Sequence, residues 1–280
     1  MNKSLRLAVI CVATTLCGHA MASDWCKFSA DKPATTLDAA GARNIVIGAG
    51  AGDLKVRGVS GQTSVIASGR ACASSEKLLA EIKLETRREG DTVYVKTVLP
   101  DADNVGIFFN HYASLDLAVS VPSTVAIRLE DSSGDTELKD VQSAVVADGS
   151  GDLEISNVAG DLEVADSSGD IDIRKVGGNL SVKDSSGDME IEDVQGNVLI
   201  PVDSSGDIRI AQVTGGVHIV NDSSGEIVIH HVKQDVTIDS DSSGDINVDD
   251  IGGSFTVGND GSGDIHHGKV AGQVSLPPGK

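Results

Sequence analysis

Aromatic residues and positive charges are both scarce in this chain. Only 2% of its 280 residues are Phe, Trp or Tyr, so the side chains that stack on nucleic-acid bases and sugar rings are nearly missing. Lys and Arg number 22 against 42 Asp and Glu, which gives a formal net charge of −20. A surface this acidic repels nucleic acid and anionic lipid headgroups and attracts cations. The composition therefore excludes nucleic acid as the expected partner.

Long apolar runs are lacking too. The run at residues 7–16 follows two basic residues and is too short to be a permanent membrane span. It leads to Ala-Met-Ala at residues 20–22, the small-x-small pattern that signal peptidase cleaves. We therefore expect residues 1–22 to be a signal peptide and the protein to be exported without a transmembrane anchor. The periplasm is the expected location, with secretion as the alternative.

Cysteine is also rare. Of the four cysteines, only Cys26 and Cys72 follow the expected cleavage site. Two thiols in an exported chain indicate one disulfide, with two free thiols as the alternative. Their separation of 46 positions (72 − 26) does not match a zinc motif.

What the chain has in abundance is one short motif, DSSGD. Its eight copies and variants begin 17, 18, 18, 19, 19, 19 and 19 residues apart, by subtraction of their numbers. A fixed period of this length is the signature of a stacked repeat. The motifs begin at Asp131, Asp148, Asp166, Asp184, Asp203, Asp222, Asp241 and Asp260.

Apolar residues keep a fixed phase within each repeat, at positions +2, +4, +7, +11 and +13 counted from the motif glycine. This pattern predicts two short strands per coil, with the apolar side chains pointing inward. A glycine corner separates the strands, at Gly178 and Gly196 for example, and we expect positive φ there. One coil has Ile171, Ile173, Val176, Leu180 and Val182 at the five positions.

A single coil of this kind is not stable alone. Five buried aliphatic side chains contribute roughly 7–15 kcal/mol, whereas ordering 18 or 19 residues costs roughly 1–2 kcal/mol each. Stacking on neighbouring coils is therefore obligatory. The sequence predicts an all-β fold, a parallel β-solenoid or β-helix with 18–19-residue coils, and a right-handed winding is favoured.

The chain before the motifs is β-rich but less periodic. We expect residues 23–130 to form an N-terminal region and residues 131–280 to form the acidic solenoid. The second part holds 29 of the 42 acidic residues and 8 of the 22 basic ones, a net charge of −21 (8 − 29). Within the first part the pattern predicts strands at 44–48, 62–67 and 114–121, a hairpin of 82–86 with 92–97, a serine-capped helical turn at 74–80, and a degenerate coil around 50–56.

The segment VPSTVAIRLEDSSGDTELKDV at residues 121–141, followed by GDLEI, GDIDI and GDMEI blocks, resembles the putative-adhesin β-strand-repeat family. These are exported or membrane-attached bacterial proteins, and the resemblance covers roughly residues 42–276. It implies a β-solenoid and an adhesin-like or envelope-associated role. It carries no active-site residue to this chain.

Stacking places the first and last acidic residues of the motifs in two columns, for which three hypotheses compete. In the first, each motif is a corner whose leading aspartate accepts hydrogen bonds from its own turn, and the charges spread into solvent. In the second, carboxylates of both columns hold calcium. In the third, the column begun by Ser132 and Ser133 is a flat ligand-binding face. The calcium candidates are Asp166, Asp170, Asp184, Asp188, Asp203, Asp207, Asp241 and Asp245.

A second metal candidate combines His230 and His231 with Asp249 and Asp250 one coil later. These residues suit a transition metal, and the alternative is a solvated polar corner.

These patterns predict a non-enzymatic, adhesin-like or envelope-scaffolding protein. It would act on a surface component, protein or glycan, through an acidic and cation-stabilised solenoid face. The alternative is a polysaccharide-acting β-helix enzyme, but the basic residues it would need, such as Arg174, Lys175 and Arg209, are scattered outward positions.

Overall fold

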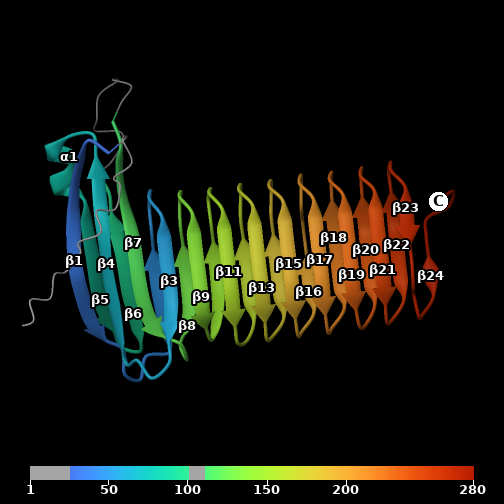
Figure 1. The fold of residues 1–280 in the computed structure, drawn as a ribbon, viewed down its shortest axis with the longest axis horizontal. Coiled ribbons are helices and arrows are strands. Elements are labelled where there is room, and N and C mark those ends of the chain that lie inside the picture. The colour runs from blue at the N-terminus through green and yellow to red at the C-terminus, as the bar shows by residue number, and fades with distance from the viewer. Residues whose placement is uncertain (1–25, 101–110) are drawn as a thin grey trace, which may run out of the picture.

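The computed structural model describes residues 26–100 and 111–280, so the expected signal peptide lies outside the described residues. The chain forms an elongated rod (Figure 1). Strands make up 60% of the structure and helix 2%, in a β-solenoid of about 8 turns with coils of about 19 residues. The predicted all-β solenoid is confirmed. No helix within the described ranges is long and apolar enough to cross a membrane.

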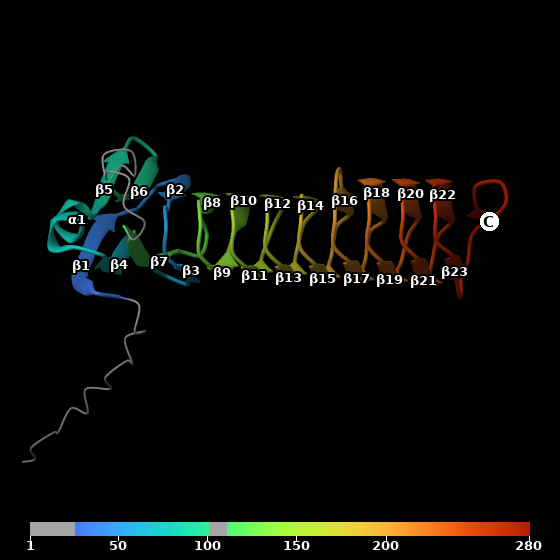
Figure 2. The same cartoon turned by 90° about the horizontal axis from the view of Figure 1, so that it is seen from above.

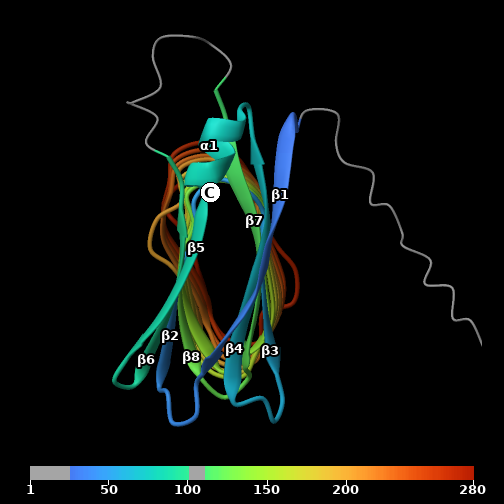
Figure 3. The same cartoon turned by 90° about the vertical axis from the view of Figure 1, so that its left-hand side faces the viewer.

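Within the described residues, two sheets of twelve strands each face one another along the rod (Figure 2). Each coil contributes one strand to each sheet, and the strands of successive coils pair in parallel at the same repeat position. Seen along the axis, the coils superpose in a flattened ring (Figure 3).

The repeat strands of the first sheet are β9 (Thr136–Val141), β11 (Leu153–Val158), β13 (Ile171–Val176), β15 (Met189–Val194), β17 (Ile208–Val213), β19 (Ile227–Val232), β21 (Ile246–Ile251) and β23 (Ile265–His267). Those of the second sheet are β8 (Ala126–Glu130), β10 (Ser143–Ala147), β12 (Leu162–Ala165), β14 (Leu180–Lys183), β16 (Val198–Ile200), β18 (Val217–Asp222), β20 (Val236–Asp241), β22 (Phe255–Asp260) and β24 (Val274–Ser275).

The predicted apolar positions fill the space between the sheets. In the coil of β13 and β14, all five of these side chains are at most 1% exposed. The step from +4 to +7 leaves two consecutive side chains outside, and the second of them takes a left-handed backbone conformation with φ of 58° to 62°. This kink turns the next side chain back to the core. The residues that adopt it are Asp140, Asn157, Lys175, Asp193, Gln212, His231 and Asp250.

Glycine serves two different purposes in each coil. The motif glycines have positive φ, 129° at Gly206 for example, and a Cβ there would lie 1.8 Å from the carbonyl oxygen of Gly187. The corner glycines, such as Gly196, do not have positive φ, so that expectation is wrong. They are glycine because of space, since a Cβ on Gly196 would lie 2.4 Å from the carbonyl oxygen of Gly178.

A first coil precedes the motifs. It consists of β2 (Asn44–Gly48) and β3 (Leu54–Val59), which pair in parallel with β8 and β9. The segment around residues 50–56, which echoes the motif, lies in this coil. The sheets therefore run on without interruption from the motif repeats into the N-terminal region.

The N-terminal end of the rod is covered by further strands. From the first coil the chain leaves the stack and returns to it in parallel through β6 (Thr92–Val98) and β7 (Ala113–Pro122). Beyond these, β5 (Lys83–Glu89) pairs with β6, and β4 (Ser64–Ala73) pairs with β7 and with β1 (Phe28–Asp38), all antiparallel. Antiparallel strands thus close this end of both parallel sheets (Figure 2).

Local predictions in this region are confirmed. The hairpin of β5 and β6 is present, and α1 (Glu76–Glu81) is capped by Ser75, whose Oγ accepts a hydrogen bond from the backbone N–H of Leu78. Cys26 and Cys72 form the predicted disulfide. It ties the start of β1 to β4.

The opposite end is more polar. His267 occupies a +4 position that is aliphatic in the other repeat coils, and it is exposed above the buried Phe255, with ring centroids 6.3 Å apart. A terminal coil is covered on one side only, so a polar residue is tolerated there.

Substitution of a motif glycine tests the close approach of the coils. We expect Gly206→Ala to lower the free energy of unfolding by at least about 3 kcal/mol, because backbone must move to admit the methyl group. Gly61→Ala is the matched control, since Gly61 also has positive φ (76°) but nothing within 4 Å of the added Cβ. That change should cost only about 1 kcal/mol. Equal losses in urea unfolding would contradict this explanation.

Candidate functional site

The first aspartate of each motif points into the protein. The exposed fraction falls from 7% at Asp131 to 0% at Asp203, Asp222 and Asp241. The expectation that these charges spread into solvent is therefore wrong. We call this set the inner column: Asp131, Asp148, Asp166, Asp184, Asp203, Asp222, Asp241 and Asp260.

Strand alternation carried a signal for this burial. Val182 points inward, Lys183 outward and Asp184 inward again. Simple extension of the alternation places Asp184 in the core. The prediction failed because an unpaired carboxylate is costly to bury, so a solvent position was preferred.

The inner column has few partners. Asp131 Oδ2 accepts a bond of 3.4 Å from Thr136 Oγ1, and Asp241 Oδ1 accepts one of 3.1 Å from the backbone N–H of Ser243. At the C-terminal end Lys280 Nζ lies 2.8 Å from Asp260 Oδ2. At Asp148, Asp166, Asp184, Asp203 and Asp222 neither carboxyl oxygen has a partner with good hydrogen-bond geometry, although backbone N–H groups of the following one or two residues lie close enough to favour the charged form.

Burial shifts the titration of this column. It raises the pKa of Asp148 and Asp222 to about 7, and the charges of the neighbouring aspartates add to the effect. It raises the pKa of Asp131, Asp184 and Asp241 to about 6, where N–H groups of the following serines oppose it.

The last acidic residue of each motif lies on the other side of the backbone. We call this set the outer column. Its aspartates accept a hydrogen bond from the backbone N–H of the equivalent residue one coil on, as Asp170 Oδ1 does from Asp188 at 3.0 Å. The outer column consists of Asp135, Asp152, Asp170, Asp188, Asp207, Glu226, Asp245 and Asp264. Its aspartates other than Asp264 accept such a bond, at 2.9 to 3.2 Å, whereas Glu226 Oε1 accepts one of 2.7 Å from Asn247 Nδ2.

The opposite corner of the ring has the same kind of ladder with other side chains. Asp161 Oδ1 accepts from the N–H of Asn179 at 2.8 Å, Asn179 Oδ1 from Asn197 at 3.0 Å, and Asn197 Oδ1 from Gly216 at 2.9 Å. An amide oxygen therefore serves as well as a carboxylate. The outer column is acidic at all eight positions, so its charge exceeds what the ladder requires.

The second serine of the motif is also engaged. Its Oγ donates to a carbonyl oxygen of the preceding coil, as at Ser186 and Ser224, with distances of 3.2 and 3.3 Å. These hydroxyls hold the corner together. A flat ligand-binding serine face stays a prediction, with its second serines already bonded within the fold.

The predicted calcium ligands are divided by this geometry. Asp166, Asp184, Asp203 and Asp241 belong to the inner column, whereas Asp170, Asp188, Asp207 and Asp245 belong to the outer one. Among residues 26–100 and 111–280, no group of three or more His, Cys, Asp or Glu side chains is placed to hold a metal ion. Calcium binding stays a prediction. Because the two columns lie on opposite sides of the backbone, it must be considered for each column separately.

The histidine candidates form two parallel pairs. His230 lies beside Asp249 in register, and His231 Nε2 lies 3.6 Å from Asp250 Oδ2. Asp249 Oδ1 accepts a bond of 2.9 Å from the N–H of Lys269, which lowers the pKa of Asp249. A transition-metal site at these residues stays a prediction.

Several basic residues on the first sheet are ion-paired between neighbouring acids. Lys139 Nζ lies 2.9 Å from Glu137 and 2.7 Å from Glu154, and Arg174 bridges Asp172 and Glu190. Arg209 lies at a shallow depression of about 410 Å³ whose other titratable residues are all acidic, on and beside β11, β13 and β15.

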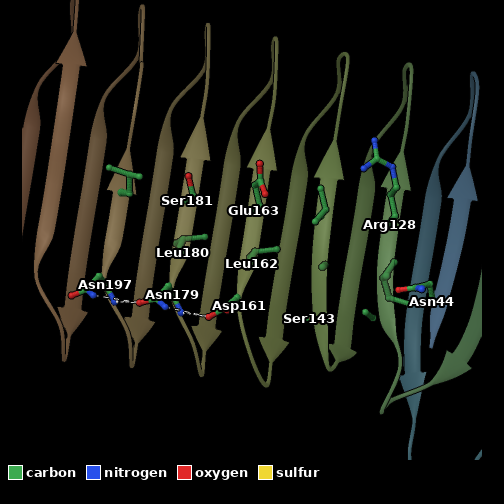
Figure 4. Close-up of a pocket in the computed structure, with 15 residues that line it drawn as sticks. Asn44, Arg128, Ser143, Asp161, Leu162, Glu163, Asn179, Leu180, Ser181 and Asn197 are labelled. Atoms are coloured by element: carbon green, nitrogen blue, oxygen red, sulfur yellow. Dashed lines mark hydrogen bonds between the residues drawn. The ribbon is translucent and has the colours of Figure 1, made fainter. Parts of the chain in front are cut away.

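The second sheet has a less charged outer face. A shallow open depression of about 820 Å³ crosses β8, β10, β12, β14 and β16, with the ladder of Asp161, Asn179 and Asn197 along one edge (Figure 4). Val145 and Leu199 in it are each 38% exposed. No sequence motif predicts this face, because its residues differ from coil to coil.

No family model matches the chain, and no curated protein does. Among solved structures, a putative lipid binding protein from Parabacteroides distasonis is 18% identical with a TM-score of 0.44, over 88% of this chain and 96% of that one. A putative adhesin from Parabacteroides merdae is 12% identical (TM-score 0.37; 89% and 96%). One from Bacteroides fragilis is also 12% identical (TM-score 0.32; 88% and 98%).

Two of these three proteins carry the adhesin name of the family that the sequence resembles. All three have identities below 20% and TM-scores below 0.5. The functional argument below therefore rests on this chain's own residues.

Paired substitutions test whether the outer ladder needs charge. Asp170→Asn keeps the acceptor oxygen, so we expect the free energy of unfolding to change by no more than about 0.5 kcal/mol. Asp170→Ala removes the acceptor and should cost about 1 kcal/mol. If both variants lose the same stability in urea unfolding, the ladder depends on charge and the comparison with Asn179 fails.

Proposed function

We propose that this protein is an exported, non-enzymatic, adhesin-like or envelope-scaffolding rod that binds a surface component through its acidic face. The observation that carries the proposal is the outer column, which is acidic at all eight positions where an amide would hold the corner equally well. Charge that the fold does not need is available for binding.

The spacing of this charge suits a repetitive or extended partner. Strands of successive coils lie about 4.8 Å apart, so the outer column presents one carboxylate at each such step. Neighbouring unit charges at that distance repel by about 1 kcal/mol in water. The basic residues of the first sheet pair with only some of the acids, and the remaining potential attracts cationic groups or bridging divalent ions.

A catalytic site is not the better explanation of the acidic face. Cleavage of a polysaccharide needs a set of different side chains gathered at one place around a cleft. The columns instead repeat one side chain from coil to coil, and Arg174 is held between two acids. We therefore propose binding rather than catalysis.

Binding to a polycation tests the acidic face. We expect the full chain to bind immobilised chitosan at low salt in biolayer interferometry, and to bind neutral dextran at least tenfold more weakly. A variant with Asp152→Asn, Asp170→Asn, Asp188→Asn and Asp207→Asn keeps the ladder and should lose at least tenfold in affinity, because attraction between opposite charges is removed.

The control variant removes four charges from the second sheet and its edges, by Asp161→Asn, Glu163→Gln, Asp235→Asn and Asp239→Asn. It should keep most of the affinity. Equal loss in both variants would mean that net charge alone attracts chitosan, and the proposal that this face is the binding surface would be rejected.

Calcium is the cation that we propose for the outer column, since carboxylate oxygens are its preferred ligands. We expect millimolar calcium to raise the melting temperature of the wild-type chain and EDTA to reverse the rise, because an ion bound to the folded state alone stabilises it. The fourfold outer variant should not respond. An unchanged wild-type melt under both conditions would refute calcium binding.

A further inference from the structure

The inner column is not used by the proposed function. It places eight carboxyl groups in single file through the core, one per coil and about 4.8 Å apart. Five of them have no well-formed hydrogen bond to either oxygen and are at most 5% exposed. The backbone N–H groups of their own turns approach these oxygens without good hydrogen-bond geometry, and polar atoms at this depth still call for a ligand or a proton.

Few charged groups face this column. Lys280 meets Asp260 at one end. At the other, Asp53 of the outer surface adds repulsion at Asp131, and Thr136 donates a hydrogen bond. Between the ends, the flanking inward side chains are aliphatic, as Ile219 and Ile227 are on either side of Asp222. The column is therefore too poor in cations to be fully ionised.

A proton supplies the missing bond. A neutral carboxylic acid has one O–H donor and keeps acceptor capacity, so a stacked acid can donate to the carboxyl of the next coil. Asparagine would also give a neutral ladder, as Asn179 and Asn197 do at the far corner. The inner column has aspartate at every position, which makes it titratable along its whole length.

We propose that the inner column is a proton-binding site, in which stacked aspartates are held as neutral acids and shared-proton pairs and make the solenoid more stable in acid than at alkaline pH. The site takes protons, and no other ligand is required.

The direction of the pH dependence follows from linkage. Burial raises the pKa of Asp222 from 3.8 to about 7 and that of Asp184 to about 6. At pH values between the ordinary pKa of 3.8 and these raised pKa values, the folded chain therefore binds more protons than the unfolded chain. The stabilisation is fully present below about pH 4 and is lost as the pH rises through 6 to 7.

A metal ion fits this column less well than protons. Calcium takes six to eight oxygen ligands, whereas each step of the column offers two carboxyl groups beside aliphatic side chains.

The test compares two variants with equal loss of formal charge. Asp203→Asn with Asp222→Asn alters the inner column, and Asp170→Asn with Asp188→Asn alters the outer one. Urea unfolding of each full chain from pH 4 to 8.5 gives the number of protons taken up on folding, from the slope of stability with pH. The inner variant should lower that number by up to two, and the outer variant should leave it nearly unchanged.

Infrared spectroscopy of the wild-type chain gives a second readout that needs no variant to fold. We expect the carbonyl band of protonated carboxylic acids at pH 6, disappearing as the pH is raised to 8.5.

Wild-type stability that rises with pH across this window, equal slopes in the two variants, or no such band at pH 6 would each overturn the proposal. An EDTA-sensitive melt that persists in the fourfold outer variant, without the band, would assign the inner column to metal ions instead. A failure of chitosan binding leaves it untouched, because that experiment concerns the outer column.

Discussion

The structure depends on one constraint, the in-register stacking of equivalent residues in successive coils. Parallel pairing places Leu153 beside Ile171 and Ile171 beside Met189, so each position of the repeat becomes a row along the rod. All residues of one row therefore share the same burial, the same kind of hydrogen bond and the same need for charge or neutrality. This is why the aliphatic rows form one continuous core, and also why any charge in the motif is repeated eight times.

The motif divides its two carboxylates between two different environments. Asp166 lies in the core, whereas Asp170, four residues later, lies in solvent and bonds to the next coil. The core thus favours the neutral acid form of aspartate, whereas the solvent-exposed position favours the charged carboxylate. The two proposals follow from this division, since one concerns protons in the core and the other a partner at the surface.

Sequence reasoning was sufficient for whatever depends on periodicity. The phase of Ile171, Ile173 and Val176 determines the strands, and it also shows that stacking is required. It was insufficient where two local rules conflict: alternation places Asp184 inside, while the cost of burying charge favours solvent. Nor could it reveal the depression around Val145 and Leu199, because that surface arises from residues of separate coils brought together by the stack.

The glycine contacts limit how such a rod can change in evolution. With the carbonyl oxygen of one motif glycine lying where the Cβ of the next would be, a side chain is excluded along this line. Changes in repeat length must fall elsewhere in the coil, and the drift from 17 to 19 residues does so. Whole coils, by contrast, can be duplicated or deleted with the equivalent rows of the remaining coils still in register. Selection can therefore adjust the length of the rod in steps of about 4.8 Å.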